Sequence, residues 1–302
     1  MEKKSTLYAL LLFGGLLAVC FTFAIVLFVS LKSATEEEHA WTSGNGPKIG
    51  VVEITGVITA ARQPLADLIA FRRDPQIKAI VVRVDSPGGA VAPSQEIFHE
   101  ILRTRKEKKV VVSMGTLAAS GGLYVSVAGD RVVASPGTIT GSIGVISEFP
   151  DVSGLMELAR VRATTVKSGA LKDVGSPLRP MSDAERAYFQ KFTDGIYEQF
   201  LGDVAEARKI DKEQLRKIAD GRVLSGKEAL DAHLVDELGN LEDALEAAVK
   251  LAGATGEPVP VFAKKNQGLL RELLHDGTEG AASAIEEHVT PRGSLLLDSR
   301  LR

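Results

Sequence analysis

The chain has 302 residues, of which 45% are hydrophobic, 25% charged and 5% aromatic, and its formal net charge is −3. This length suits one large domain or two small ones, and the lack of a basic excess argues against a nucleic-acid-binding protein. The single cysteine, Cys20, excludes disulfide bonds within the chain and cysteine-based metal sites. The five histidines are scattered without ligand spacing, so we expect neither a metal site nor a cofactor.

The N-terminal segment carries the clearest signal in the sequence. Residues 5–31 contain no charged side chain, and about 20 apolar residues in a helix span a bilayer core of roughly 30 Å. Two alternatives fit less well. A cleaved signal peptide has an apolar core of about 7–15 residues, and a lipoprotein signal ending at Cys20 would place the bulky Val19 where a small residue is needed. We predict an uncleaved transmembrane anchor over residues 6–31, after a cytoplasmic N-terminus of residues 1–5.

The charges that flank the anchor predict its orientation. Lys3 and Lys4 precede it, and residues 36–38 are all glutamates, whereas Lys32 is a contrary charge. Lysine and arginine are retained on the cytoplasmic side of a membrane. The body of the protein is therefore expected outside the cytoplasm, after a polar linker over residues 32–47.

The segment that follows the linker alternates between apolar and amphipathic runs. Runs rich in β-branched residues predict strands at 48–58, 77–84 and 109–115. Runs with apolar residues spaced near 3.6 predict helices at 63–74 and 94–108. Strands that alternate with helices indicate βαβ units, so we predict an α/β fold with a mostly parallel sheet.

Capping signals predict further helices toward the C-terminus. Ser182 with Glu185, and Ser225 with Glu228, form capping boxes. The helices expected from these signals and from the apolar spacing cover residues 183–208, 227–239 and 241–253. We place the end of the domain at residue 262 and regard residues 263–302 as a peripheral tail.

Two turns at the ends of predicted strands could carry chemistry. The sequence "DSPGG" at 85–89 lies where open α/β sheets bind ligands, outside the carboxyl end of a strand. Its glycines allow backbone N–H groups to face an anion or an oxyanion, although a tight structural turn has the same composition. The sequence "ASGG" at 119–122 places Ser120 at the start of the next helix, either as a nucleophile or as a helix cap in a packing joint.

A serine nucleophile needs a base that takes its proton. None of the histidines has an obvious orienting carboxylate, and the G-x-S-x-G elbow is absent because Ala118 and Ala119 precede Ser120. Lysine remains as a base. Lys167 and Lys172 both lie in the glycine-containing stretch "TTVKSGALKDVG". The residues alone leave the choice between them open, and a solvated surface charge is the ordinary alternative for either.

Five separated motifs together resemble the signal peptide peptidase A family of membrane-anchored serine proteases. From about Ile49 to Leu251, they appear in the family's order and spacing as "DSPGG", "ASGGLYVSVAGD", "SPGTITGSIGVI", "KSGALKD" and "ADGRVLSGKEALDAHLVDELG". The resemblance implies the crotonase- and Clp-protease-like fold of repeated βαβ units, in its short single-domain form, over residues 48–262. It also implies a single-pass protein of the bacterial cytoplasmic (inner) membrane, with its protease domain on the periplasmic side.

The resemblance assigns roles to particular residues. Ser120 would be the nucleophile that forms an acyl-enzyme, Lys172 its general base and Ser142 the hydroxyl that orients the lysine. The oxyanion hole would be formed by a backbone N–H group of the turn at Gly88 and Gly89, together with that of Gly121; the sequence leaves open which of the first two glycines donates. The implied substrates are remnant signal peptides and similar hydrophobic peptides.

The resemblance also implies a ring- or dome-shaped homo-oligomer in which neighbouring subunits supply the serine and the lysine of one site. A lysine base must be neutral, which burial in an apolar pocket favours and a nearby carboxylate opposes. We therefore expect the carboxylate of Asp173 to point away from Lys172 and to form an ion pair elsewhere.

Three rival interpretations remain open. The chain could be a non-catalytic membrane-anchored scaffold, although the presence of both Ser120 and Lys172 argues against this. It could be a related membrane protease that acts with a stomatin-like partner. An acyl-CoA hydratase-like enzyme on the same fold is disfavoured by the predicted anchor and by the lack of paired carboxylates near the glycine turn.

Overall fold

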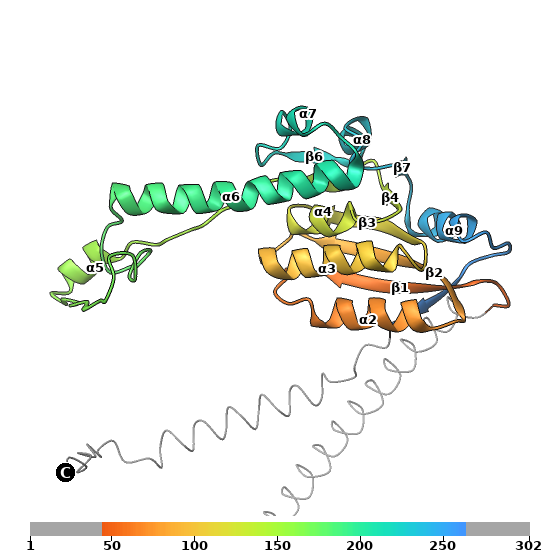
Figure 1. The fold of residues 1–302 in the computed structure, drawn as a ribbon, viewed down its shortest axis with the longest axis horizontal. Helices are drawn as coiled ribbons and strands as arrows, with labels where there is room; N and C mark the ends of the chain where they lie inside the picture. Colours follow the sequence, from red (N-terminus) through yellow and green to blue (C-terminus); the bar gives the residue numbers. More distant parts are fainter. Residues whose placement is uncertain (1–43, 264–302) are drawn as a thin grey trace, which may run out of the picture. The chain divides into compact units, whose positions relative to one another are not determined.

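A computed structural model describes residues 44–263 of the chain (Figure 1). The predicted anchor at 6–31 lies outside these residues, as do residues 32–43 of the linker and 264–302 of the tail. Within the described part of the chain, no helix combines the length and the apolar composition that crossing a bilayer requires.

An eight-stranded sheet forms the centre of the domain. Six strands follow the order β6-β5-β3-β2-β1-β8, and β4 pairs with both β3 and β7. The pairs formed by the described strands are parallel except for β5 with β6, which is antiparallel. The strands are β1 (Lys48–Thr55), β2 (Ile77–Ser86), β3 (Val110–Ala118), β4 (Arg131–Ala134), β5 (Ile139–Gly141), β6 (Val223–Ser225), β7 (Glu237–Leu238) and β8 (Val259–Phe262).

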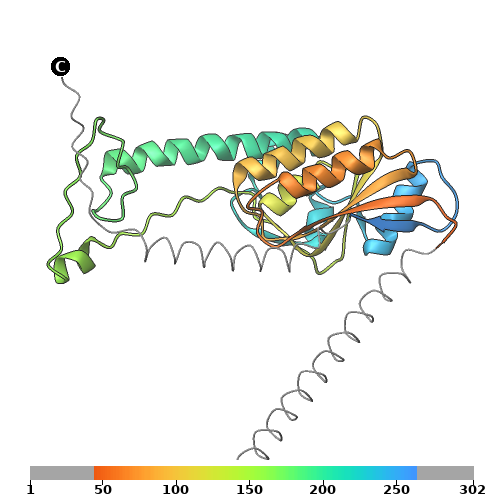
Figure 2. The same ribbon diagram turned by 90° about the horizontal axis from the view of Figure 1, so that it is seen from below.

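Helices connect these strands and cover both faces of the sheet. They are α2 (Arg62–Arg73), α3 (Val91–Thr104), α4 (Gly121–Ser126), α5 (Ser153–Leu158), α6 (Asp183–Arg208), α7 (Lys212–Arg216), α8 (Gly226–Asp231) and α9 (Leu241–Leu251). Figure 2 shows α2 and α3 on one side of the sheet and α9 on the other. The predicted βαβ arrangement and mostly parallel sheet are confirmed.

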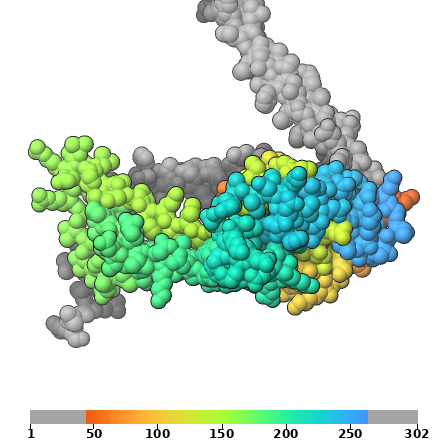
Figure 3. Space-filling model, turned by 90° about the horizontal axis from the view of Figure 1, so that it is seen from above, coloured from red at the N-terminus to blue at the C-terminus, as the bar shows by residue number. Residues whose placement is uncertain are grey.

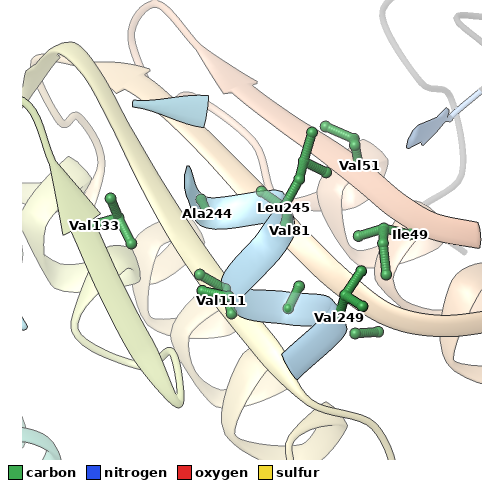
Figure 4. Packing of buried hydrophobic residues seen from close by; sticks show 11 residues of the cluster. Ile49, Val51, Val81, Val111, Val133, Ala244, Leu245 and Val249 are labelled. Atoms are coloured by element: carbon green, nitrogen blue, oxygen red, sulfur yellow. The ribbon is translucent and has the colours of Figure 1, made fainter. Parts of the chain in front are cut away.

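The two faces of the central strands are filled by different helices. On one face, alternate strand residues such as Val51, Val81 and Val111 pack against Leu245 and Val249 of α9 (Figure 4). These strands are buried on both sides, which explains their almost continuous runs of valine and isoleucine.

The opposite face of the sheet contacts α2 and α4, and α3 packs against both of these helices. Here β1 carries a glycine, because a Cβ at Gly50 would lie 2.6 Å from the ring of Phe71 on α2. The buried residues of α3 include Ile97 and Ile101, whose spacing of four places them on one side of the helix. The close packing of these helices fixes the carboxyl ends of β2 and β3, where the two candidate turns lie.

A long excursion leaves the sheet between β5 and β6. We call residues 144–193 the arm; they comprise an extended segment, α5, an irregular stretch and the first turns of α6 (Figure 1). Most side chains of this region are exposed or half-buried. In Figure 3 the arm, coloured lime to green, extends away from the layers that contain the sheet.

The structure confirms the capping boxes and corrects one predicted helix. Ser182 and Glu185 cap α6, and Ser225 and Glu228 cap α8. The helix expected over residues 227–239 is wrong in its second half, because α8 ends at Asp231 and Glu237 pairs with Val133 of β4. Strand pairing therefore overrides the helical spacing of this stretch. The arm and β8, which pairs with β1, were not predicted.

Candidate active site

Ser120 occupies a strained turn between β3 and α4. Its backbone has φ 53° and ψ −119°, a combination that costs a non-glycine residue about 1–3 kcal/mol. Hydrogen bonds on both sides hold it there: its N–H donates to the carbonyl of Gly141 (2.9 Å), and its carbonyl accepts from the N–H of Tyr124 (2.9 Å). Among the described residues its hydroxyl has no hydrogen-bond partner. The side chain is therefore presented in a fixed direction with its oxygen free.

The small residues around Ser120 allow two backbone segments to approach closely. A Cβ at Gly88 (φ +95°) would lie 2.5 Å from the nitrogen of Gly121. A Cβ at Gly121 would lie 2.6 Å from Oγ of Ser94, and one at Gly122 would lie 2.6 Å from the carbonyl oxygen of Ser86. The sequences "SPGG" and "ASGG" are thus two halves of one close contact, which brings Gly88 and Gly121 beside the serine.

The hydrogen bonds of this contact distinguish the two glycines of the first turn. The N–H of Gly88 donates to Oγ of Ser86 (3.1 Å). The bridge between Ile58 and Gly89 uses the Gly88 carbonyl and the Ala90 N–H, which leaves the N–H of Gly89 out of the pairing. Within residues 44–263 the N–H groups of Gly89 and Gly121 have no protein acceptor, whereas that of Gly88 is already used.

Ser142 lies directly after β5, also in an uncommon backbone conformation (φ 52°). Its N–H donates to the carbonyl of Arg222 (2.7 Å), which extends the antiparallel pairing of Gly141 with Val223. Its hydroxyl, like that of Ser120, has no partner within the described part of the chain. Both serines line one cavity.

This cavity has a volume of about 630 Å³ and contains most of the predicted site residues. Ser120, Gly89, Gly121 and Ser142 all contribute to its wall, and Gly88 lies directly behind it. Further parts of the wall come from α3, α4, the segment after β5, α6 and the loop before β6. They include Val91, Gln95, Tyr124, Ile143, Val145, Ile146, Gln190, Asp194, Tyr197, Phe200 and Asp220. The wall thus combines apolar side chains with side-chain amides and carboxylates.

Tyr124 was missed by sequence reasoning, although it lies one helical turn after Ser120. Its ring also lines the cavity and is 4.9 Å from that of Phe98 and 4.6 Å from that of Phe200. Its hydroxyl donates to the carboxylate of Asp203 on α6. Burial, and next this hydrogen bond, raise the pKa of Tyr124 well above its ordinary value. The spacing of four from Ser120 is the signal that could have identified it.

Lys172 does not join this group within one chain. It lies in an irregular turn of the arm, is exposed and is not part of the cavity wall. Its neighbour Asp173 accepts hydrogen bonds from Nε of Arg179 (3.0 Å) and from Nζ of Lys167. The expectation that Asp173 forms ion pairs away from Lys172 is therefore confirmed, and Lys167 is itself engaged in that contact.

A serine in a strained strand-to-helix turn, next to unpaired backbone N–H groups in a cavity, is the arrangement of a serine hydrolase, and comparison with known proteins agrees. The family model described as "Clp protease" matches residues 52–139. The model described as "Peptidase family S49" matches residues 103–255. The chain belongs to peptidase family S49 and is a serine protease with a Clp-protease-like mixed α/β domain.

Individual relatives support the same family. A candidate protease of Synechocystis sp. is 38% identical over 213 residues, which cover 70% of this chain and 77% of the relative. A candidate signal peptide peptidase SppA of Enterococcus faecium is 38% identical over 211 residues, covering 70% and 61%. Protease 4 of Salmonella typhi is 41% identical over 182 residues, covering 60% and 29%. The chain thus spans about three quarters of the first of these relatives and less than two thirds of the other two. The resemblance seen in the motifs is confirmed at the level of the family.

Proposed function

We propose that this chain is a membrane-anchored serine endopeptidase that cleaves remnant signal peptides and similar hydrophobic peptides through an acyl-enzyme on Ser120. One observation carries the proposal: Ser120, Gly89 and Gly121 line one cavity, and within residues 44–263 the hydroxyl of the serine and the N–H groups of the two glycines have no protein partner. Such donors stabilise the oxyanion that forms when a hydroxyl attacks a carbonyl, and losing one donor typically costs 10²–10³ in kcat.

The reaction follows from these groups. Oγ of Ser120 attacks the carbonyl carbon of the scissile peptide bond, and its proton passes to the neutral amine of Lys172. The carbonyl oxygen becomes an oxyanion that accepts hydrogen bonds from the N–H groups of Gly89 and Gly121. The tetrahedral intermediate collapses, the C–N bond breaks, and the protonated lysine gives its proton to the leaving amine. Water then releases the acyl group by the same steps, with Lys172 taking the proton of the water.

Lys172 acts in this scheme on the serine of a neighbouring chain. Its exposed position outside the cavity of its own chain supports this assignment. The arm that carries it also exposes large apolar side chains, among them Val166 (95% exposed), Ile146 (83%) and Leu158 (82%). Exposed apolar side chains gathered in one region are typical of interaction surfaces. We therefore assign the arm to the subunit contact of a closed homo-oligomer.

The substrate class rests on the cavity and on the predicted anchor. Ile143, Val145, Tyr197 and Phe200 provide apolar surface beside Ser120, which suits the apolar core of a signal peptide. An anchor over residues 6–31 would keep this site at a membrane surface where such peptides are released. The Enterococcus relative carries the corresponding name. Fractionation followed by protease digestion of intact spheroplasts tests the location, since the domain is expected to be digested from the periplasmic side.

Hydrolysis of a fluorogenic signal-peptide substrate by the full chain in detergent, together with labelling by a fluorophosphonate, tests the chemistry. Wild type should hydrolyse the peptide and be labelled, and Ser120→Ala should lose both. Lys172→Ala should lower kcat by about 10³-fold or more while the chain stays folded. Retention of activity by either variant would refute the corresponding role and, for Ser120→Ala, would favour a different nucleophile or a scaffold.

Co-expression of the two inactive variants tests the contribution of two subunits to one site. A Lys172→Ala chain keeps its serine, and a Ser120→Ala chain keeps its lysine. In a closed ring with one type of contact, about a quarter of the sites then combine an intact serine with an intact lysine. Recovery of that order supports shared sites, and no recovery would place both residues of a site in one chain.

A further inference from the structure

The turn that carries Lys172 has little regular structure of its own. It lies in an irregular stretch between α5 and α6, where the N–H of Lys172 donates to the carbonyl of Gly169 (3.1 Å) and that of Val174 to the carbonyl of Leu171 (3.3 Å). These bonds, and a third from the N–H of Ser176 to the carbonyl of Asp173 (3.0 Å), do not fix the direction of a long side chain in an exposed turn. The order of this turn therefore depends on side chains around it.

Four charged side chains surround the turn, and we call them the charge clamp: Lys167, Asp173, Arg179 and Glu185. Nζ of Lys167 donates to the carboxylate of Asp173 and to the carbonyl of Ala170 (3.0 Å). Arg179 is the centre of the clamp. Its Nε donates to Asp173 (3.0 Å), and its two terminal nitrogens donate to Glu185 at 2.9 and 2.5 Å. One guanidinium thus joins two carboxylates, a geometry that lysine cannot reproduce.

The clamp connects the turn to the start of α6. Glu185 is the third residue of that helix, its side chain is only 8% exposed, and it also accepts from the N–H and the hydroxyl of Ser182 in the capping box. Asp173, at the other end, is 12% exposed. Arg179, and next Lys167, lower the pKa of the Asp173 carboxyl to about 2, so this group stays ionised near neutral pH.

Apolar contacts hold the same turn from the other side. A Cβ at Gly175 would lie 2.6 Å from the ring of Phe149, and this ring is 4.4 Å from that of Phe189 on α6. The N–H of Val152 also donates to the carbonyl of Pro177 (2.8 Å). One side of the turn therefore packs against the extended segment of the arm and α6, whereas Lys172 is exposed and Asp173 next to it is held by the clamp.

We propose that the charge clamp, with Arg179 at its centre, is a positioning device for Lys172 that holds the turn in the arrangement needed by the serine of the neighbouring subunit. The proposal rests on the assignment of Lys172 as the base. The clamp has a second effect, because Asp173 is adjacent to Lys172 in the chain. Without Arg179 the Asp173 carboxylate keeps only Lys167 as a charged partner and can also pair with the Lys172 amine. An opposite charge close to that amine favours the protonated lysine, which is inactive as a base. Arg179 is thus a positioning residue that acts through Lys172.

The test uses mixed oligomers in which the clamp is broken on only one of the two partners of a site. The reference is full-length Ser120→Ala co-expressed with full-length Lys172→Ala. In one experiment Arg179→Gln is added to the Ser120→Ala chain, which supplies the lysine. In the other it is added to the Lys172→Ala chain, which supplies the serine. The matched control is Arg131→Gln in the lysine-supplying chain, because Arg131 of β4 pairs with Glu237 of β7 (3.0 Å), outside the arm and the cavity.

Breaking the charge clamp should lower kcat when the broken clamp is on the chain that supplies the lysine, and should leave kcat unchanged when it is on the chain that supplies the serine. Arg179→Gln in the Ser120→Ala chain is expected to lower kcat roughly 10- to 100-fold, because small misplacements of a catalytic group have effects of this size. KM should stay near the reference value, since the cavity belongs to the other chain. Arg179→Gln in the Lys172→Ala chain, and the Arg131→Gln control, should remain within about twofold of the reference, and Arg179→Lys should recover only part of the loss, because lysine cannot reproduce the forked contact.

Each other outcome overturns the proposal in a recognisable way. Equal losses in both placements of Arg179→Gln would show that Arg179 serves folding or assembly, which size-exclusion profiles of the same mixtures would also reveal. No loss in either placement would show that the clamp is dispensable. An inactive reference mixture would refute presentation to a neighbouring subunit, and an active Lys172→Ala chain on its own would refute the assignment of the base. Activity of the Lys172→Ala chain on its own would contradict the proposed function, whereas the other outcomes above concern the clamp or the subunit contact.

Discussion

The contact between Gly88 and Gly121 makes a quantitative prediction about Gly88→Ala. The added Cβ would lie 2.5 Å from the nitrogen of Gly121 and 2.9 Å from both the carbonyl oxygen of Ala119 and Cβ of Ser120. All of these atoms belong to the turn that carries the serine. The separation from the Gly121 nitrogen must grow by about 0.9 Å to reach the 3.4 Å of ordinary contact. The substitution therefore displaces the start of α4 relative to the first glycine turn.

The size of this displacement predicts how far kcat should fall. A misplacement near 1 Å costs about 10²-fold in rate, and loss of one oxyanion donor costs about 10²–10³-fold in kcat. We expect Gly88→Ala to lower kcat by about 10²–10³, with a smaller change in KM, measured by peptide hydrolysis and by the rate of fluorophosphonate labelling. The left-handed backbone (φ +95°) adds about 1–2 kcal/mol of strain for a non-glycine residue, so stability should fall as well.

Gly56→Ala is the control that separates these two effects. Gly56 also has a positive φ (+69°), but no atom lies within 4 Å of the position of its added Cβ. It should lose a similar amount of stability, measured by chemical denaturation, and keep its activity. A folded Gly88→Ala variant whose kcat is within about threefold of that of Gly56→Ala would refute this prediction. It would show that Gly88 is not in the described contact with the turn that carries Ser120.

Two further predictions concern stability. Leu245 of α9 is 1% exposed against the sheet, so Leu245→Ala should lower the free energy of unfolding by about 2–5 kcal/mol; a loss below about 1 kcal/mol in a denaturant titration would contradict the packing described. The pKa of Asp173 is lowered from 3.8 to about 2 by Arg179 and then Lys167, so its contribution to stability is fully present above about pH 4 and is lost as the pH falls toward 2. The difference in unfolding free energy between wild type and Asp173→Asn should therefore shrink over that range, and a difference independent of pH would show that the clamp does not act through charge.

Local signals in the sequence predicted much of the fold because they depend on near neighbours. The valine and isoleucine runs identified β1 to β3, and the capping box of Ser182 and Glu185 marked the start of α6. The stretch after α8 could not be predicted in this way. His233 adopts a positive φ (60°), and Glu237 pairs with a strand about 100 residues earlier in the chain. Helical spacing in residues 232–239 carries no information about that distant partner.

In the candidate site, too, the features set by local sequence could be predicted, and those that depend on tertiary contacts could not. The glycine turns could be located from the sequence because close approach of two backbones demands glycine at Gly88 and Gly121. The use of the Gly88 N–H by Ser86 could not, because it depends on the rotamer of one buried side chain. Tyr124 was missed because an aromatic residue in a small-residue helix has an ordinary explanation as core, and only its contact with Asp203 and the cavity distinguishes it.

The positions of Ser120 and Lys172 explain why the proposed base was the hardest residue to place. Ser120 lies in a buried turn whose geometry is fixed by hydrogen bonds within one chain, so the sequence of that chain contains the information that positions it. Lys172 lies on the exposed arm, ordered by a charge clamp rather than by a core. A lysine on such an arm becomes desolvated only when another surface covers it, and desolvation favours the neutral amine that can accept a proton. If the proposed subunit contact forms, assembly would then switch the protease on, because an isolated chain would hold a positioned nucleophile without a neutral amine beside it.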